Sequence, residues 1–370
     1  MKTIIINGAN GFVASNFISE LLSLNYNVVA LVRADDNESA KKRMLISLAK
    51  KSGIDTFKTE KLRVLNYALF KANFGIQTEI LKELFESDVA YFHFAASLKF
   101  SEKSKEEIFE TNINGLENSI KTFLNFATVQ SQFFYISTAY SSGKIQEVFE
   151  EKFYPNQKIS AFRNYYEQSK RFAENLVKSY MESHQLKAHI IRPSQVVGNN
   201  TTGITKTDFG IFDFTKRIYN LSGRYPNETI RIKADANATQ NLIPVNTLVS
   251  YLILVLSVKE LPVIINCVAK TPVTNSDIIN LISNIINVNL VPVTHMERDS
   301  MTAIERIVEI GMSFTGKYIN THTQFDTTNL EKITNTTGCS VSINDLQKML
   351  DYFVESLSAE KKAYKLERIN

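Results

Sequence analysis

The chain has 370 residues, enough for one large domain or for a large domain with a small appendage, and either arrangement buries an ample core. Hydrophobic residues make up 44% of the chain and charged residues 22%, as in ordinary soluble globular proteins, and the net charge is only +4. Lysine and arginine are scattered rather than gathered in runs, so we expect no nucleic-acid partner.

The number and spacing of the cysteines and the lengths of the apolar runs exclude further classes of protein. The two cysteines, Cys267 and Cys339, lack the spacing of a zinc site, so we expect neither a structural metal nor a disulfide framework. The apolar run before Asn7 is too short for a signal peptide, and the run at residues 252–256 is too short to span a bilayer. These features predict a cytoplasmic protein without an integral membrane segment.

The first predicted strand, residues 2–7, is dominated by apolar side chains, as in strands buried on both faces of a parallel sheet. It leads into a turn with the spacing Gly8-x-x-Gly11-x-x-Ala14, which opens an amphipathic helix. Glycines at such a turn let a pyrophosphate approach the N–H groups at the start of the helix, and a small residue lets the helix pack on the strand. Strand, turn and helix in this order predict a dinucleotide site.

The second predicted strand, residues 27–32, ends at Arg33, where NAD enzymes usually carry an acid that holds the ribose 2′-hydroxyl. An arginine suits a 2′-phosphate instead, and Arg43, ten residues on, can close on the same group. Both features favour NADP over NAD. Two alternatives stay open, because Arg43 can belong to a solvated helix face and Asp35 or Asp36 can contact a ribose.

Further strands and helices alternate along the chain. Strands are predicted at residues 62–65, 89–94, 133–137 and 187–191, and helices at residues 105–127 and around Tyr166. This alternation predicts an α/β fold with a doubly wound parallel sheet, the Rossmann arrangement. We expect residues 1–200, with a returning segment at about 240–270, to form the cofactor-binding domain. Residues 201–370 are expected to form a smaller, mixed α/β substrate-binding part with C-terminal helices.

Two polar residues in apolar surroundings each allow two interpretations. His93 ends the fourth predicted strand, just before Ala95 and other small residues that let backbone lie against a cofactor. It is either a catalytic base or a satisfied core histidine. Asn112 lies in the following helix, where its amide either bridges neighbouring strand ends or faces solvent.

Tyr166 and Lys170 are four residues apart on one predicted helix, so their side chains share a face. A nearby cation favours the phenolate and eases transfer of its proton to a developing alkoxide, which is useful beside a hydride donor. Thr138 follows the fifth strand, 28 residues before Tyr166, and its hydroxyl can donate to a substrate carbonyl. These residues predict a carbonyl-reducing site, and a surface contact between Tyr166 and Lys170 is the alternative.

The character of the chain changes after Gly198. Residues 199–206 are polar and predict a loop over the cleft. Residues 208–221 carry several aromatic side chains, which either line an apolar substrate channel or form the core of a helix. Further helices are predicted at residues 246–256, 276–286 and 343–356, with a strand at 263–268 and a charged tail at 360–368.

Several segments together carry a resemblance to a known superfamily. They are residues 7–14, 31–34, 40–44, 93–100, 112–115, 137–140, Tyr166 with Lys170, residues 192–198 and, more weakly, residues 325–330. With these segments the chain resembles the extended short-chain dehydrogenase/reductase superfamily, and within it the male-sterility-like branch of fatty acyl-CoA reductases and thioester reductase domains.

The resemblance implies that Thr138, Tyr166 and Lys170 are the catalytic hydroxyl, acid and supporting cation. It implies the following cofactor-binding residues: Gly8, Asn10, Gly11, Phe12 and Ala14 around the pyrophosphate, Arg33 and Arg43 at the 2′-phosphate, and Ala95, Asn112, Pro193 and Val196 towards the nicotinamide. The chain departs from the family pattern at Asn7, usually threonine or glycine, at Ala14, usually glycine, and at Asn66-Tyr67, usually Gly-Asp against the adenine.

The resemblance further implies reduction of an acyl thioester by NADPH to an aldehyde, which a second hydride can carry on to an alcohol. The acyl group is expected on a small molecule such as CoA or on a carrier protein, and the chain is expected to be a monomer or a homodimer. The alternatives are an NADP-dependent ketone or aldehyde reductase, a hydroxysteroid-like dehydrogenase, a nucleotide-sugar epimerase, which the sparse basic residues at 199–235 disfavour, and a non-catalytic NADP-binding regulator.

Overall fold

The computed structural model describes residues 3–52, 59–225, 228–311, 317–318, 320–336 and 338–367, and the chain forms two compact units. The first unit contains Met1–Ser194, Thr247–Val268 and Gln324–Gly338, and the second contains Gln195–Asn246, Ala269–Thr323 and Cys339–Asn370. The predicted start of the first strand at Lys2 and the predicted end of the charged tail at Arg368 lie outside the described residues.

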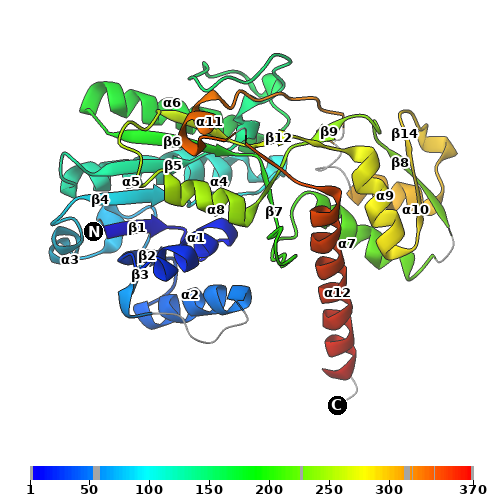
Figure 1. Cartoon of the computed structure of the whole chain (residues 1–370), viewed down its shortest axis with the longest axis horizontal. Helices are drawn as coiled ribbons and strands as arrows, with labels where there is room; N and C mark the ends of the chain where they lie inside the picture. The colour runs from blue at the N-terminus through cyan, green and yellow to red at the C-terminus, as the bar shows by residue number, and fades with distance from the viewer. Residues whose placement is uncertain are drawn as a thin grey trace. The chain divides into compact units, whose positions relative to one another are not determined.

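A parallel sheet forms the centre of the first unit. Its strands are β1 (Thr3–Asn7), β2 (Val28–Val32), β3 (Leu62–Asn66), β4 (Val89–His93), β5 (Gln132–Ile136), β6 (Ala188–Pro193) and β11 (Ile264–Cys267). The seven strands run parallel in the order β11-β6-β5-β4-β1-β2-β3 (Figure 1). The predicted doubly wound parallel sheet is therefore confirmed.

Helices connect and cover these strands. They are α1 (Phe12–Ser23), α2 (Asn37–Ser52), α3 (Thr78–Leu84), α4 (Lys105–Phe109), α5 (Gly115–Phe126), α6 (Tyr165–His184), α8 (Val245–Leu254) and α11 (Thr328–Thr334), with short turns η1 (Thr59–Lys61), η2 (Ala72–Gly75), η3 (Glu102–Ser104), η4 (Glu110–Asn114), η5 (Ala139–Ser142) and η6 (Ile159–Ala161). The first two residues of α8 fall in the second unit.

Burial explains why the strands are continuous apolar runs. Every residue of β2 and of β4 is buried. One face of the sheet packs against α3, α5 and α6 in a core that includes Leu81, Leu116 and Val177. On the other face, Phe17 of α1 meets Phe92 of β4 with ring centroids 4.9 Å apart. A strand covered on both faces needs an apolar side chain at every position.

The strand order reverses at β1, which lies between β2 and β4. In open α/β sheets, ligands bind beyond the carboxyl ends of the strands at such a reversal. Five residues predicted for the cofactor and catalytic site lie at or just beyond the carboxyl ends of these strands. They are Gly8 after β1, Arg33 after β2, Ala95 after β4, Thr138 after β5 and Pro193 at the end of β6. The sheet thus brings residues that are far apart in the sequence to one edge.

The predicted helix at residues 105–127 is interrupted by one wide π-type turn, η4, between α4 and α5. Asn112 lies in this turn and is buried. Its side chain accepts a hydrogen bond from the Ser97 backbone N–H at 2.7 Å and donates to Ser169 Oγ at 2.9 Å. A single π turn inside a helix often marks a functional site, because it redirects a side chain.

The second unit consists of short strands in pairs and four helices among its described residues. They are β7 (Gln195–Val197), α7 (Ile211–Ser222), β8 (Thr229–Lys233), β9 (Thr239–Gln240), β10 (Leu242–Pro244), β12 (Ala269–Thr271), β13 (Val273–Thr274), α9 (Asn275–Ile286), β14 (Asn289–Val293), η7 (Arg298–Ser300), α10 (Ala303–Gly311), β15 (Cys339–Ser340) and α12 (Ile343–Glu367). β14 pairs with β8 in parallel, and β13 pairs with β9 in antiparallel orientation. The smaller part is therefore mixed α/β, as predicted.

The aromatic stretch after Asp208 forms part of the core of this unit. Phe212, Phe214 and Ile218 on α7 are buried together with residues of α9 and α12, whereas Phe209 before the helix is half exposed. Of the two interpretations of this stretch, the helix core is the one that its burial supports.

The last helix, α12, runs from Ile343 to Glu367 and includes most of the segment predicted as a charged tail after Ser356. Alanine, glutamate, lysine and leucine, which dominate residues 359–367, are strong helix formers, and this explains the extension. Across the described ranges of the chain, no helix combines the length and apolarity that crossing a membrane requires.

Candidate active site

Tyr166 and Lys170 lie on α6, whose start is set by Asn164. The Asn164 side chain accepts a hydrogen bond from the Glu167 backbone N–H at 2.9 Å, which satisfies one of the free donors at the helix start. Tyr166 therefore lies in the first turn of the helix, and Lys170 lies one turn later on the same face.

Lys170 is buried, with its side chain directed at the neighbouring strand. Its Nζ donates to the Ile136 backbone oxygen at 2.9 Å and lies 4.9 Å from the centre of the Tyr135 ring and 6.0 Å from that of Tyr166. Burial lowers the pKa of Lys170 to about 7, and the charge of Glu174 opposes this shift. The charge of Lys170 in the free protein thus depends strongly on its immediate neighbours.

Tyr166 is a half-buried phenol at the same edge of the sheet. Burial raises its pKa above the ordinary value, and a hydrogen bond with the Thr138 side chain lowers it in part. The Phe100 ring packs edge-on against the Tyr166 ring, with centroids 5.4 Å apart. A phenol in this state keeps its proton until a basic oxygen develops beside it, as a general acid must.

Thr138 is held in place by the backbone around it. Its Oγ1 accepts a hydrogen bond from the Tyr140 N–H at 3.2 Å and donates to the Pro193 carbonyl oxygen at 3.4 Å. The structure therefore brings together Thr138, Tyr166 and Lys170, the three residues predicted to be catalytic.

The glycine turn after β1 lies directly against the loop after β4. Gly8 has φ +60°, and a Cβ there would lie 2.8 Å from the Ala95 nitrogen, so only glycine fits without strain. Gly11 occupies the cap position of α1, Phe12 is the first residue of that helix, and Asn10 is half-buried before it. Backbone N–H groups at the start of a helix can bind an anion.

Asn7, a departure from the family pattern, has a clear structural role. Its Oδ1 accepts hydrogen bonds from the Phe94 and Ala95 N–H groups at 2.9 and 3.1 Å, and its Nδ2 lies 2.8 Å from Nδ1 of His93. Asn7 thus joins the carboxyl ends of β1 and β4. Burial, aided by the charge of Lys170, lowers the pKa of His93 to about 3. Burial and the lowered pKa favour a neutral core histidine over a base, but only Nδ1 of its ring has a described partner, because Nε2 is buried without one.

Arg33 and Arg43 are both exposed and lie next to each other. Arg43, on α2, donates a hydrogen bond from Nη1 to the Arg33 backbone oxygen, which brings its guanidinium group to the end of β2. Asp36, the alternative ribose ligand, accepts a hydrogen bond from the Ser39 N–H at 2.7 Å near the start of α2. Two exposed arginines near the end of β2 suit a phosphate.

The end of β3 departs from the family pattern, and its residues are engaged within the protein. Asn66 Oδ1 accepts from the Ala34 N–H at 3.0 Å, and the Asn66 N–H donates to Asn37 Oδ1 at 2.7 Å. Tyr67 is buried, which raises its pKa to about 12, while a hydrogen bond to the Gly8 backbone lowers it in part. These contacts fasten β3 to the loop after β2 and to the glycine turn.

The remaining predicted cofactor residues differ in their surroundings. Ala95 is buried beside Gly8, and Pro193 accepts the hydrogen bond of Thr138. The Asn112 side-chain amide makes hydrogen bonds with Ser97 and Ser169. Val196 lies on β7, which belongs to the second unit. Direct contacts of these residues with a cofactor remain predictions.

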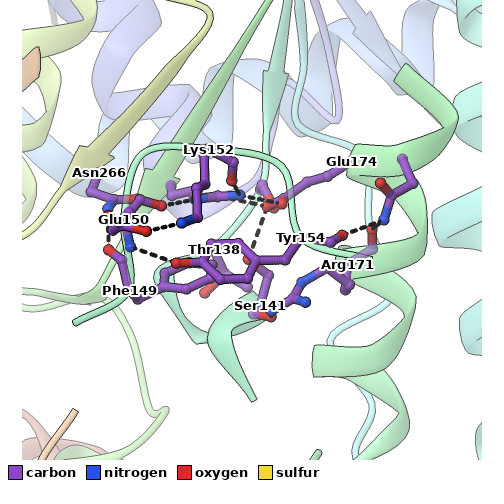
Figure 2. Close-up of polar contacts among 12 residues, drawn as sticks. Thr138, Ser141, Phe149, Glu150, Lys152, Tyr154, Arg171, Glu174 and Asn266 are labelled. Carbon is purple, nitrogen blue, oxygen red and sulfur yellow. Dashed lines mark hydrogen bonds and ion pairs between the residues drawn. The ribbon is translucent and has the colours of Figure 1, made fainter. Parts of the chain in front are cut away.

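A buried ion pair that the sequence analysis did not identify lies behind these residues. Glu174, four residues after Lys170 on α6, accepts hydrogen bonds at Oε1 from Ser137 at 2.5 Å, Ser141 at 2.9 Å and Nε of Arg192 at 3.0 Å, and at Oε2 from Nη2 of Arg192 at 2.6 Å. Figure 2 shows Glu174, midway along α6, above Ser141 and Thr138. A carboxylate one helical turn from Lys170, and an arginine inside an apolar strand, are the signals that could have indicated it.

Relatives of known sequence and structure fit this arrangement. Residues 6–252 match the model of an NAD-binding family described as "Male sterility protein". The chain is 26% identical over 230 residues to the putative fatty acyl-CoA reductase CG8303 of Drosophila melanogaster, with 53% of this chain and 41% of the relative covered. It is 28% identical over 225 residues to the nonribosomal peptide synthetase asaC of Aspergillus flavus, with 58% and 21% covered. The chain therefore spans less than half the length of these curated relatives.

The fold as a whole also has a counterpart among solved structures. The terminal R domain from the myxalamid PKS-NRPS biosynthetic pathway superposes with a TM-score of 0.78 at 19% identity, covering 96% of this chain and 91% of that one. At this identity the superposition shows a shared fold.

Proposed function

Because this chain belongs to the male sterility protein family of NAD-binding domains, we propose that it is an NADPH-dependent reductase of acyl thioesters. The observation that carries the proposal is the grouping of the Thr138 hydroxyl, the Tyr166 phenol and the Lys170 ammonium group at the carboxyl edge of a dinucleotide-binding sheet. The family relatives named fatty acyl-CoA reductase and nonribosomal peptide synthetase support a thioester as the substrate class.

A nicotinamide dinucleotide fits the residues that are present. The turn at Gly8 leaves no room for a Cβ, as expected where backbone approaches a ligand closely, and it opens onto the start of α1. Gly8, Asn10, Gly11 and Phe12 would hold the pyrophosphate there. When bound, the reduced cofactor supplies the hydride.

The preference for NADPH over NADH rests on Arg33 and Arg43. Both guanidinium groups are exposed near the end of β2, and no acid follows directly where an NAD enzyme would bind the ribose. Two arginines can bind a 2′-phosphate through charge-assisted hydrogen bonds. Ala95, Asn112 and Pro193 of the first unit would complete the nicotinamide side.

In the proposed reaction, the side chains stabilise the oxygen of the thioester carbonyl. Tyr166 and Thr138 would donate hydrogen bonds to this oxygen as it gains negative charge, and Tyr166 would pass its proton to it. Lys170 would favour the phenolate that remains. The product of this step is a hemithioacetal, which collapses to a thiol and an aldehyde.

We assign the two units different tasks. The first unit, which carries the glycine turn and Tyr166, would bind the cofactor and perform catalysis, and the second would bind the acyl substrate. The carrier of the acyl group is CoA or the pantetheine arm of a carrier protein, which share the same thiol chemistry. A cytoplasmic location and a monomeric or homodimeric state remain predictions of the sequence.

The test is oxidation of NADPH by the purified chain with four substrates: a long-chain acyl-CoA, an acyl-pantetheine, the matching aldehyde and a simple ketone. Oxidation with either thioester supports the proposal. Oxidation with only the aldehyde or the ketone would move the chain to the ketone and aldehyde reductases and leave Tyr166 and Lys170 in their roles. Tight NADPH binding without any turnover would indicate a non-catalytic regulator.

A further inference from the structure

We propose that Glu174 and Arg192 form a positioning pair that holds Thr138, Tyr166 and Lys170 in register and keeps Lys170 charged. This inference rests on the proposed function, since it assigns a role for that same site. Neither residue needs to touch substrate or cofactor, because each acts through its sequence neighbours.

The pair connects the backbone segments that carry the catalytic residues. Glu174 lies one helical turn after Lys170 on α6. It accepts a hydrogen bond from Ser137, the residue directly before Thr138. Its partner Arg192 directly precedes Pro193, whose carbonyl oxygen accepts the hydrogen bond of Thr138. One carboxylate therefore links α6 to the ends of β5 and β6, and a shift of any of them would move a catalytic side chain.

Arg192 is itself locked in place by other contacts. Its Nη1 donates to the Glu150 carbonyl oxygen at 3.1 Å, its Nη2 donates to that of Lys152 at 3.0 Å, and its guanidinium carbon lies 4.4 Å from the centre of the Phe149 ring. Figure 2 shows this loop, with Phe149, Glu150 and Lys152, beside Glu174. The guanidinium plane thus has a single favourable orientation.

A later part of the chain anchors the same loop. The Phe149 N–H donates to the Gln324 carbonyl oxygen at 2.8 Å, and Nδ2 of Asn266 donates to the carbonyl oxygens of both Phe149 and Asp326 at 3.0 and 2.9 Å. This gives a structural reason for the segment at residues 325–330, which resembled the superfamily only weakly: it supports the loop on which Arg192 packs.

Stability alone is a weak explanation for such a pair. The Arg192 and Glu174 side chains are 0% and 1% exposed, and taking two charges out of water costs about as much as their attraction returns. A pair of packed apolar side chains would stabilise the fold at least as well. Fixed geometry and a fixed charge beside Lys170 are what the ion pair adds.

The charge of Lys170 depends on the groups that face it. Tyr166 and Glu174 lie on its own helix, Tyr135 on β5 contacts its Nζ, and His93 on β4 is neutral. Of these four neighbours, Glu174 alone carries a negative charge. Since burial favours the uncharged amine, Glu174 is the one of these four groups whose charge favours the ammonium form.

The test compares Glu174→Gln, which keeps the size and one acceptor oxygen, with the double variant Glu174→Gln plus Arg192→Met, which removes both charges. The matched control is Glu305→Gln in the second unit, a second buried carboxylate paired with an arginine. Lys170 is titrated by NMR of carbon-13-labelled lysine and assigned with Lys170→Arg. NADPH turnover and thermal unfolding are measured on the same proteins.

We expect Glu174→Gln to lower the pKa of Lys170 by about one unit and to lower kcat by about a hundredfold, because a lost charge and a small displacement both act on the site. The double variant should unfold at a higher temperature than Glu174→Gln and still have a low kcat. If Glu174→Gln fails to fold, the double variant carries the test alone, and it should again lower the pKa of Lys170.

Two outcomes would overturn the inference: an unchanged titration of Lys170 without Glu174, or recovery of full turnover in the double variant. The titration needs no substrate. If the wild-type chain reduced no thioester while Lys170 still responded to Glu174, the proposed function would fail and the positioning role would stand. If the wild-type chain reduced a thioester but the titration of Lys170 did not change without Glu174, the proposed function would stand and the positioning role would fail.

Discussion

One bidentate arginine–carboxylate pair in each unit of the described chain can be compared, and the two differ in access to water. In the first unit, both partners of Glu174–Arg192 are almost fully buried. In the second, the Glu305 side chain is 1% exposed but that of Arg231 is 36% exposed. Glu305 accepts from Nε and Nη2 of Arg231 at 2.7 and 2.8 Å and from the Thr302 N–H at 2.8 Å.

The two pairs link different kinds of structure. Glu305–Arg231 joins the start of α10 to β8, and the other hydrogen bonds described for the pair are with Ser300 and Thr302, so we expect its effect to be on stability alone. Glu174–Arg192 lies next in sequence to the residues around the proposed catalytic site. The comparison leads us to expect different effects from similar ion pairs, according to their sequence neighbours and their burial.

The largest effect on turnover is expected from a change at Tyr166, in the proposed catalytic site that Glu174–Arg192 would support. Replacing Tyr166 by phenylalanine removes the proton donor, so kcat should fall by roughly 10²–10⁴-fold while NADPH still binds. Fluorescence of bound NADPH and steady-state turnover measure the two properties separately. The control is Tyr165→Phe, which removes the same hydroxyl from the preceding residue, whose ring packs on Phe109. Equal turnover in the two variants would remove Tyr166 from the mechanism.

A smaller effect is expected at the arginines near the end of β2. Replacing both Arg33 and Arg43 by alanine should weaken NADPH binding by about ten- to a hundredfold, since charge-assisted hydrogen bonds to a phosphate contribute roughly 1.5–3 kcal/mol. NADH lacks the 2′-phosphate, so its affinity should stay within about twofold. Titration calorimetry with both cofactors measures the difference, and Lys42→Ala, at an exposed position of the same helix as Arg43, is the control. An equal loss for NADH would show that the arginines do not select the phosphate.

The smallest effect, on stability, is expected from a change in the half-exposed pair Glu305–Arg231. Glu305→Gln should lower the free energy of unfolding by about 1–3 kcal/mol and leave kcat unchanged, because it weakens charged hydrogen bonds far in sequence from Tyr166. Its hydrogen bonds with Arg231 lower the pKa of Glu305 to about 2 from its ordinary value of 4.5. The contribution is therefore complete above about pH 4.5 and is lost as the pH falls towards 2. Denaturant unfolding across this range should show wild type and variant converging in acid, and a constant difference would contradict the assignment.

The sheet was predictable because its strands are buried on both faces. Most strands of the first unit are short, largely apolar runs, although the edge strand β3 carries Arg63 and is mostly half-buried, and the residues that follow these strands lie at one edge by the geometry of parallel strands. This is why Gly8, Arg33 and Thr138 could be predicted to lie at one edge of the sheet, whereas Tyr166 was predicted from its helical spacing to Lys170. The second unit, with strands of two to five residues in separate pairs, offers no such periodicity.

The residues that were missed act through partners distant in the sequence. Glu174 and Arg192 are 18 residues apart, and Ser137 is 37 residues before Glu174, so no local pattern links them. Asn7 was noted only as a departure from a family, although its amide joins β1 to β4 across 88 residues. The π turn at Asn112 depends on contacts with Ser97 and Ser169 that the helical periodicity does not reveal.

The most direct test of the central proposal counts thiol release against NADPH consumption with a long-chain acyl-CoA. Thioester reduction consumes one hydride for each thiol released if an aldehyde leaves, and two if the aldehyde is reduced further. We predict one of these two ratios in the wild-type chain, with both thiol and NADP⁺ production lost in Tyr166→Phe. Thiol release without NADPH oxidation would mean hydrolysis, and NADPH oxidation without thiol release would mean reduction of another carbonyl. Either result would contradict the proposal that this site reduces thioesters.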